Sequence, residues 1–166
     1  MASPAARREE SSCNCGALRK ASRRVSRIYD DALAPVGLGS SQHTILAELG
    51  RRTDQPPTLW ELSQALVMDR TTIARNLRPL ERDGYVAVRP SDVDRRSKLV
   101  VLTAAGKAKL AESRVFWLQA QKTFERIFGA TEAQQLRSQL LSIANNDAFE
   151  TAIRSDSLNR AGHPNG

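Results

Sequence analysis

The sequence between Thr58 and Thr103 decides the fold: TLWELSQALVMDRTTIARNLRPLERDGYVAVRPSDVDRRSKLVVLT. Its first part predicts a short amphipathic helix, because Thr58 precedes Glu61 by the three residues that a capping box requires. One apolar stripe follows at helical spacing, made of Leu59, Leu62 and Leu66. Val67 and Met68 then form a turn that leads into a second helix.

The second helix has a basic outer face. Asp69 is suited to cap its start, since a carboxylate can accept hydrogen bonds from the free amides of a first helical turn. The predicted buried face consists of Ile73, Leu77 and Leu80. At roughly 100° per residue, the opposite face and its flanks carry Arg70, Thr71, Thr72, Arg75, Arg78 and Arg82. Asp83-Gly84 ends the helix, and Pro79 predicts a kink within it.

A short β-hairpin follows this helix. Residues 85–88 and 98–102 are rich in β-branched side chains, which favour strands. The loop between them is too long for a tight turn and carries Arg89, Arg95 and Arg96, partly offset by Asp92 and Asp94. Helix, turn, basic helix and hairpin in this order predict a winged helix-turn-helix, mainly α with a small β wing. The helix would fit a major groove and the loop would reach phosphates or the minor groove, although a basic face can also be merely solvated.

The wing sequence resembles that of a known family. DRRSKLVVLTAAG, residues 94–106, is similar to the wing signature of the MarR-type transcriptional regulators, and Asp69-Arg70-Thr71-Thr72 is similar to the start of their recognition helix. The resemblance extends over about residues 17–150. It implies a homodimer in which Arg96 enters the minor groove, steadied by an ion pair with Asp69 or Asp94. Arg95 joins the wing, Arg70, Thr71, Thr72 and Arg75 contact bases and nearby phosphates, and Arg78 and Arg82 contact the backbone.

Composition supports a nucleic-acid partner. The chain has 166 residues, 40% of them hydrophobic, a net charge of +7 and a pI of about 10.1. Such a basic balance suits a partner with many negative charges, and double-stranded DNA is the simplest one. No stretch approaches the roughly 20 apolar residues that span a bilayer, and MASPAARREE has no apolar segment like that of a signal peptide. We therefore expect a cytoplasmic protein without a membrane partner.

The winged helix is flanked by helices from both ends of the chain. We expect tails at 1–12 and 161–166 and one unit at 13–160, with the DNA-binding part at about 40–103. Ser40 or Ser41 should cap the helix that opens this part, and Thr131 with Gln134 should cap a late helix. The flanking helices, at about 17–34 and 104–155, are apolar on more than one face and need a partner surface, which predicts dimerisation through a second copy.

Both cysteines lie in the tripeptide Cys13-Asn14-Cys15. The start of a helix and nearby basic residues favour a reactive thiolate, so these cysteines are candidates for an oxidation sensor. Metal binding by the thiolates and a purely structural role at the helix start are the alternatives, and C-x-C lacks the spacing of ordinary zinc sites. We therefore predict neither a resident metal nor a cofactor.

The family resemblance also implies a small aromatic or anionic effector. Candidate lining residues are Arg23, Tyr29, His43 and Trp117. No catalytic arrangement or phosphate-binding loop is recognisable, so we expect no enzyme. The sequence thus predicts a dimeric DNA-binding regulator of a pseudo-palindromic operator, and the resemblance implies that it is a repressor released by a small molecule or by oxidation. The alternatives are a thiol redox or metal sensor with secondary DNA binding, and a winged-helix module that binds another protein.

Overall fold

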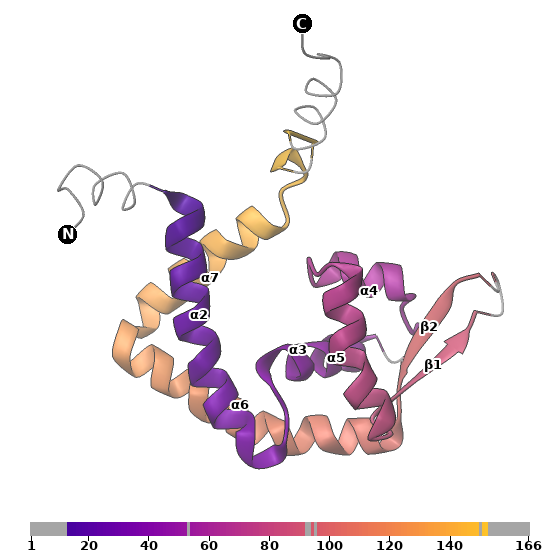
Figure 1. Cartoon of the computed structure of the whole chain (residues 1–166). Helices are drawn as coiled ribbons and strands as arrows, with labels where there is room; N and C mark the ends of the chain where they lie inside the picture. Colours follow the sequence, from indigo (N-terminus) through magenta and orange to yellow (C-terminus); the bar gives the residue numbers. More distant parts are fainter. Residues whose placement is uncertain (1–12, 53, 92–93, 95, 150, 153–166) are drawn as a thin grey trace, which may run out of the picture. The chain divides into compact units, whose positions relative to one another are not determined.

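The computed structural model describes residues 13–52, 54–91, 94, 96–149, 151 and 152. The expected tails at 1–12 and 161–166 and the wing residue Arg95 lie outside this part of the chain. Figure 1 shows the elements in order: α2 (Asn14–Leu33), η1 (Ala34–Val36), α3 (Ser40–Arg51), α4 (Leu59–Ala65), α5 (Arg70–Arg82), β1 (Val86–Pro90), β2 (Lys98–Leu102), α6 (Ala104–Phe128) and α7 (Ala130–Ala144). The predicted fold class, mainly α with a small wing, is confirmed.

The wing is a two-stranded antiparallel sheet. β1 pairs with β2 in a register that places Val86 opposite Leu102 and Pro90 opposite Lys98. The first strand begins one residue later than predicted, because Tyr85 belongs to the turn: its amide donates to Leu80 O at 2.8 Å. An isolated bridge between Thr58 and Leu99 adds the residue before α4 to the far side of β2. The hairpin is therefore paired directly to the residue that precedes the helix-turn-helix.

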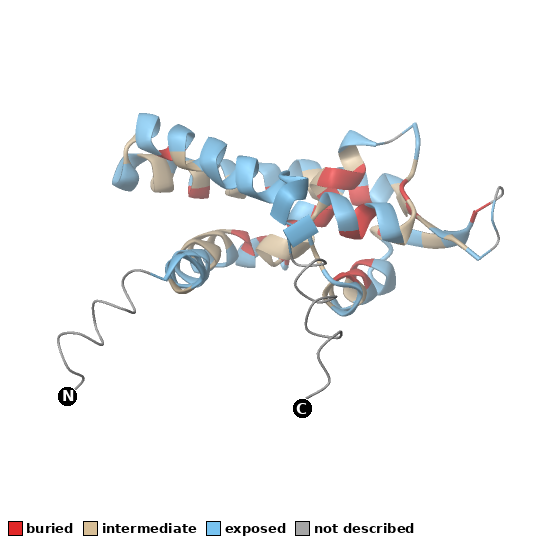
Figure 2. Cartoon of the chain, turned by 90° about the horizontal axis from the view of Figure 1, so that it is seen from above, coloured by how far each residue is buried: buried red, intermediate tan, exposed pale blue. Residues whose placement is uncertain are grey.

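The chain divides into two compact units, one up to Thr123 and one from Phe124. The division falls inside α6, and the single unit expected for 13–160 stays a prediction. The first unit contains the main core, whose fully buried side chains are Leu33, Ile45, Leu46, Leu62, Ile73, Leu80 and Val100. Figure 2 draws the buried residues in red. The predicted apolar faces of α4 and α5 thus form the interior on which the wing is built.

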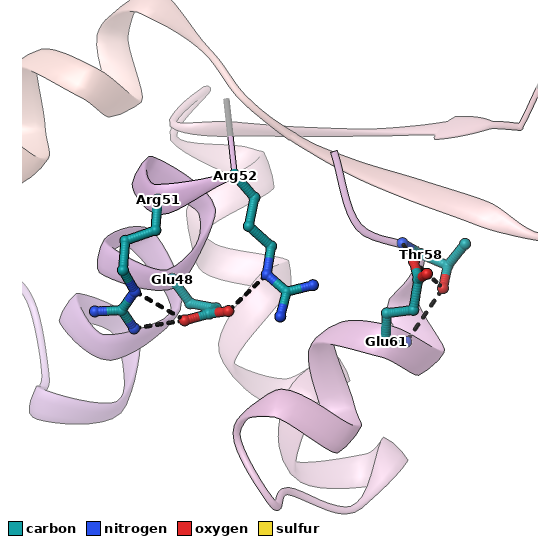
Figure 3. A network of polar contacts seen from close by, with 5 residues as sticks. All are labelled: Glu48, Arg51, Arg52, Thr58 and Glu61. Carbon is teal, nitrogen blue, oxygen red and sulfur yellow. Dashed lines mark hydrogen bonds and ion pairs between the residues drawn. The ribbon is translucent and has the colours of Figure 1, made fainter. Parts of the chain in front are cut away.

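Local side-chain caps begin α4 and α5 as predicted. Thr58 Oγ accepts from the amide of Glu61 at 3.1 Å, and the Glu61 carboxylate accepts from the amide of Thr58 at 2.7 Å. Figure 3 shows this reciprocal pair. Asp69 accepts from the amide of Thr72 at 2.9 Å. α5 then continues through Pro79 to Arg82, and Gly84 follows with a φ of 74°, the left-handed conformation expected after the helix.

Two other predicted caps are wrong. α3 begins at Ser40 with Gly39 as its cap residue, and the Ser40 amide donates to Asp30 Oδ1 at 2.7 Å. A carboxylate ten residues earlier therefore performs the role expected of a local serine. α7 begins at Ala130, before the proposed Thr131 box, with Gly129 at a φ of 97° as its cap residue.

A tight corner joins the wing to α6. The Thr103 hydroxyl donates to Gly84 O at 2.7 Å, and its oxygen accepts from the amide of Gly106 at 3.0 Å. A Cβ at position 106 would lie 2.0 Å from Tyr85 O, far inside any allowed contact. Gly106 is therefore required for α6 to begin this close to the end of α5.

The second unit exposes apolar side chains. Within it, Phe124 stacks on Phe128 with ring centroids 5.3 Å apart, and Arg137 pairs with Glu125 at 3.5 Å. Large side chains remain exposed on this unit, namely Ile127, Phe128, Leu140, Leu141, Ile143 and Phe149. In the first unit, Val115 and Leu118 of α6 are exposed as well. Among the described helices, none is long and apolar enough to cross a bilayer.

Candidate nucleic-acid interface and adjoining cavities

The outer face of α5 presents unpaired cations. Arg70, Thr71, Arg75 and Arg78 are exposed. Within the described part of the chain, no ion pair engages Arg70, Arg75 or Arg78. Since the buried side of the helix is held by the core, these guanidinium groups are directed outward and are free to meet an anionic surface.

Two other predicted contact residues of α5 have local partners. The Thr72 hydroxyl donates to Asp69 Oδ2 at 2.6 Å, so Thr72 completes the cap of the helix. Hydrogen bonds from Thr72, the side-chain one foremost, hold the pKa of Asp69 below its usual value. Arg82 pairs with Asp83 at 2.8 Å, which offsets its charge at the end of the helix. The cationic part of the face is therefore its N-terminal two-thirds.

The described end of the wing is ordered by Asp94. Its carboxylate accepts from the amide of Arg96 at 3.0 Å and from the Ser97 hydroxyl at 2.8 Å. These bonds lower the pKa of Asp94, that of Ser97 contributing most. Asp94 thus supports Arg96 through its backbone, whereas the described residues contain no ion pair between the Arg96 guanidinium and Asp69 or Asp94.

A cleft of about 280 Å³ joins the start of α5 to the wing. We call it the wing cleft; its lining residues are Thr58, Leu59, Trp60, Arg70, Arg96, Ser97 and Lys98. The structure therefore brings together Arg70 and Arg96, which the sequence placed on separate elements. Trp60 and Lys98 were missed by sequence reasoning. The one signal in the sequence was that Trp60 lies outside the stripe of Leu59, Leu62 and Leu66; in the structure it is 59% exposed.

Not all basic residues near this interface are free. Glu48 of α3, 8% exposed, accepts from Arg51 Nε at 3.1 Å and from Arg52 Nε at 2.7 Å. Both arginines converge on this carboxylate in Figure 3. Burial raises the pKa of Glu48, but the bonds and charges of the two arginines outweigh it and lower the pKa overall. Glu48 offsets one of these two positive charges, and the cluster stabilises the end of α3.

Two cavities meet around His43 and Trp117, which are both predicted effector residues. The larger, about 510 Å³, is also lined by Arg51 and Arg114, and the smaller, about 320 Å³, by Tyr29. The His43 and Trp117 rings stack with centroids 6.0 Å apart. Three of the four predicted effector residues thus converge, while Arg23 lines neither cavity.

The hydrogen bonds around His43 favour one tautomer. His43 Nδ1 lies 3.0 Å from Ser113 Oγ, which also donates to Leu110 O at 3.0 Å. With the Ser113 proton on Leu110 O, Nδ1–H donates to Ser113 and Nε2 is left as an acceptor. No buried side-chain nitrogen or oxygen of the described residues lacks a partner, so the unbonded Nε2 is accessible from a cavity. Burial lowers the pKa of His43, which favours this neutral form.

Cys13 and Cys15 are free and exposed. Cys13 Sγ accepts from the amide of Gly16 at 3.3 Å and caps α2, so one of the two thiols has the structural role considered for it. Among the described residues, no group of His, Cys, Asp or Glu is arranged to hold a metal ion.

A capped basic helix beside a β-hairpin with a shared cationic cleft defines a winged helix-turn-helix protein. A model of the MarR family matches residues 36–97. The uncharacterized HTH-type transcriptional regulator YwoH of Bacillus subtilis is 33% identical over 105 residues, 63% of this chain and 74% of YwoH.

Solved structures extend the likeness over most of the chain. The transcriptional regulator MosR of M. tuberculosis, in complex with DNA, is 31% identical with a TM-score of 0.72, covering 85% of this chain and 98% of MosR. The transcriptional repressor CouR of Rhodococcus jostii, bound to a 23-mer DNA duplex, is 28% identical with a TM-score of 0.72, covering 82% and 96%. The chain belongs to the MarR family of winged-helix transcriptional regulators.

Proposed function

We propose that this protein is a homodimeric, sequence-specific DNA-binding repressor of a pseudo-palindromic operator. The observation that carries the proposal is the convergence of Arg70 and Arg96 on one cleft, because it presents the recognition helix and the wing to a single duplex. Arg70, Thr71 and Arg75 would read base edges in the major groove, while Arg96 would enter the minor groove. The DNA complexes of MosR and CouR, and the description of CouR as a repressor, support the assignment.

Dimerisation is supported by the exposed apolar side chains of α6 and α7. Val115 and Leu118 on the first unit, and Ile127 and Leu141 on the second, are each at least 40% exposed. Several large apolar side chains exposed on each of the two units are typical of an association site. A second copy of the chain is the simplest partner, since a two-fold dimer would also supply the second recognition helix that an inverted-repeat operator requires.

A small aromatic anion is the effector that the His43 cavities suit best. Trp117 and Tyr29 offer aromatic surface, Arg114 offers a positive charge, and His43 Nε2 can accept a hydrogen bond. Release of DNA would require that the ligand favour a geometry whose recognition helices no longer match the half-sites.

Oxidation of Cys13 and Cys15 is a second candidate signal, because both thiols are exposed. A peroxide would oxidise one thiol to a sulfenic acid and release water. A thiol of the second protomer would then displace a second water and form a disulfide between subunits. Cys13 would thereby lose its role as the cap of α2.

Selection of bound sequences from random duplex DNA tests the proposal. We expect an inverted repeat, and its loss in the presence of peroxide would support the cysteine signal. Arg75→Ala should weaken binding to cognate DNA by about 1 to 3 kcal/mol and leave unrelated DNA unaffected. Arg96→Ala should weaken binding to all sequences and reduce the salt slope. Salt-sensitive binding without any motif would contradict a sequence-specific regulator and favour a protein-interaction module.

A further inference from the structure

We propose that Trp60 is a DNA-contacting residue that packs on the sugar-phosphate backbone in the wing cleft, an inference that rests on the DNA-binding function proposed above. Trp60 is 59% exposed, the largest exposed side chain of the helix-turn-helix. Exposing an indole forgoes a large amount of apolar burial, and such residues commonly lie where a partner covers them. Here the indole lines a cleft together with three cationic residues, Arg70, Arg96 and Lys98.

The charges of the cleft select an anionic occupant. Arg70, Arg96 and Lys98 are exposed, and in the part of the chain that the structure describes none of them pairs with a carboxylate. Hydroxyl-bearing Thr58 and Ser97 complete the polar lining. Three unpaired cations along one cleft of about 280 Å³ suit the repeated phosphates of a polymer backbone that crosses it.

The position of the cleft identifies the occupant as duplex DNA. Arg70 starts the helix assigned to the major groove, and Arg96 belongs to the wing assigned to the minor groove. A strand of the backbone separates the two grooves, so its phosphates must pass between these residues. The Trp60 ring can pack on a deoxyribose there, and its Nε1–H can donate to a phosphate oxygen.

The support for Trp60 is rigid. The amide of Val100 donates to Pro57 O at 2.9 Å, and the bridge between Thr58 and Leu99 continues this pairing. The capping box of Thr58 and Glu61 fixes the first turn of α4, on which Trp60 lies. The backbone that carries Trp60 is therefore held by the wing strand as well as by the helix cap, and little backbone entropy should be lost when DNA covers the indole.

The experiment compares Trp60→Ala and Trp60→Phe with Val67→Ala, which removes exposed apolar surface outside the cleft. Affinity for the selected operator and for an unrelated duplex is measured by anisotropy of labelled DNA over a range of salt. We expect Trp60→Ala to weaken both by the same factor, roughly tenfold for an aromatic contact, with an unchanged salt slope because the indole carries no charge. Lys98→Ala should instead reduce the slope by about one. Val67→Ala should bind as the wild type does.

A second measurement does not depend on how Trp60→Ala folds. In the wild type, acrylamide should quench the tryptophan fluorescence less when duplex DNA is bound. Trp60→Phe should abolish that difference between free and bound protein. Two results would overturn the inference: operator binding that leaves Trp60 fluorescence as accessible to acrylamide as before, or an unaltered operator affinity of folded Trp60→Ala. Either result would leave the proposed function as a DNA-binding regulator in place. Equal protection by AMP alone would make the cleft a nucleotide site and also overturn it. Absence of any DNA binding by the wild type would instead refute the proposed function itself.

Discussion

Gly106 shows how strongly one position can constrain the chain. Its missing side chain leaves room for Tyr85 O, which would lie 2.0 Å from a Cβ. We expect Gly106→Ala to lower the free energy of unfolding by about 1 to 3 kcal/mol, as overpacking does, despite the higher helix propensity of alanine. Urea unfolding with an unchanged m-value is the measurement. Gly16→Ala is the matched control: its Cβ would lie 3.6 Å from Cys13 Sγ, and equal losses in both variants would contradict the steric explanation.

His43 predicts a pH-dependent loss of stability. Burial lowers the pKa of His43 in the folded state, whereas the unfolded chain keeps a value of about 6.5. The unfolded state therefore binds more protons between these two values, and stability must fall as the pH drops below about 6.5, by at most about 1.4 kcal/mol per pH unit. His43→Phe, which keeps an aromatic ring beside Trp117, should show a smaller decrease in Tm between pH 8 and pH 5. Parallel Tm curves would contradict this assignment.

Helix α4 depends on its capping box. Thr58→Ala removes the oxygen that accepts from the amide of Glu61, and a lost N-cap of this kind costs about 1 kcal/mol. Thr58→Ser keeps the hydroxyl and should retain most of that stability. Thermal unfolding of the two variants measures the difference. If serine destabilised as much as alanine, the methyl group and its packing, rather than the cap, would be responsible.

Helix boundaries were predictable where the signal is local. Thr58 and Asp69 cap their own helices, so sequence spacing predicted the starts of α4 and α5. The start of α3 was predicted one or two residues too late, because its first amide binds Asp30, which only the turn through η1 brings close. In the candidate site, too, the features with a local signal were predictable and those that depend on long-range contacts were not. The cations of α5 were predictable from helical periodicity, whereas the meeting of Arg70, Arg96 and Trp60 depends on how β2 pairs beside α4.

The assembly state can be tested through the exposed apolar residues of the second unit. Ile127 is 70% exposed, and a charge there should disrupt the proposed dimer. We expect sedimentation equilibrium of the wild type at micromolar concentration to give twice the chain mass of 18.3 kDa. Ile127→Glu should shift the mass toward that of one chain. Gln135→Glu adds the same charge at an exposed polar position and should remain dimeric. A monomeric wild type would contradict the dimer.

The corner at Gly106 also limits how this sequence can diverge. Most outward positions of α6 can accept many substitutions, because their side chains meet only solvent or a partner. Position 106 accepts them only at a cost in stability, since every other amino acid brings a Cβ against Tyr85 O. A descendant that lost this glycine would have to shift the turn at Tyr85 away from the start of α6. Glycine at 106 should therefore persist in distant descendants of this chain even where the exposed basic residues of α5 have changed.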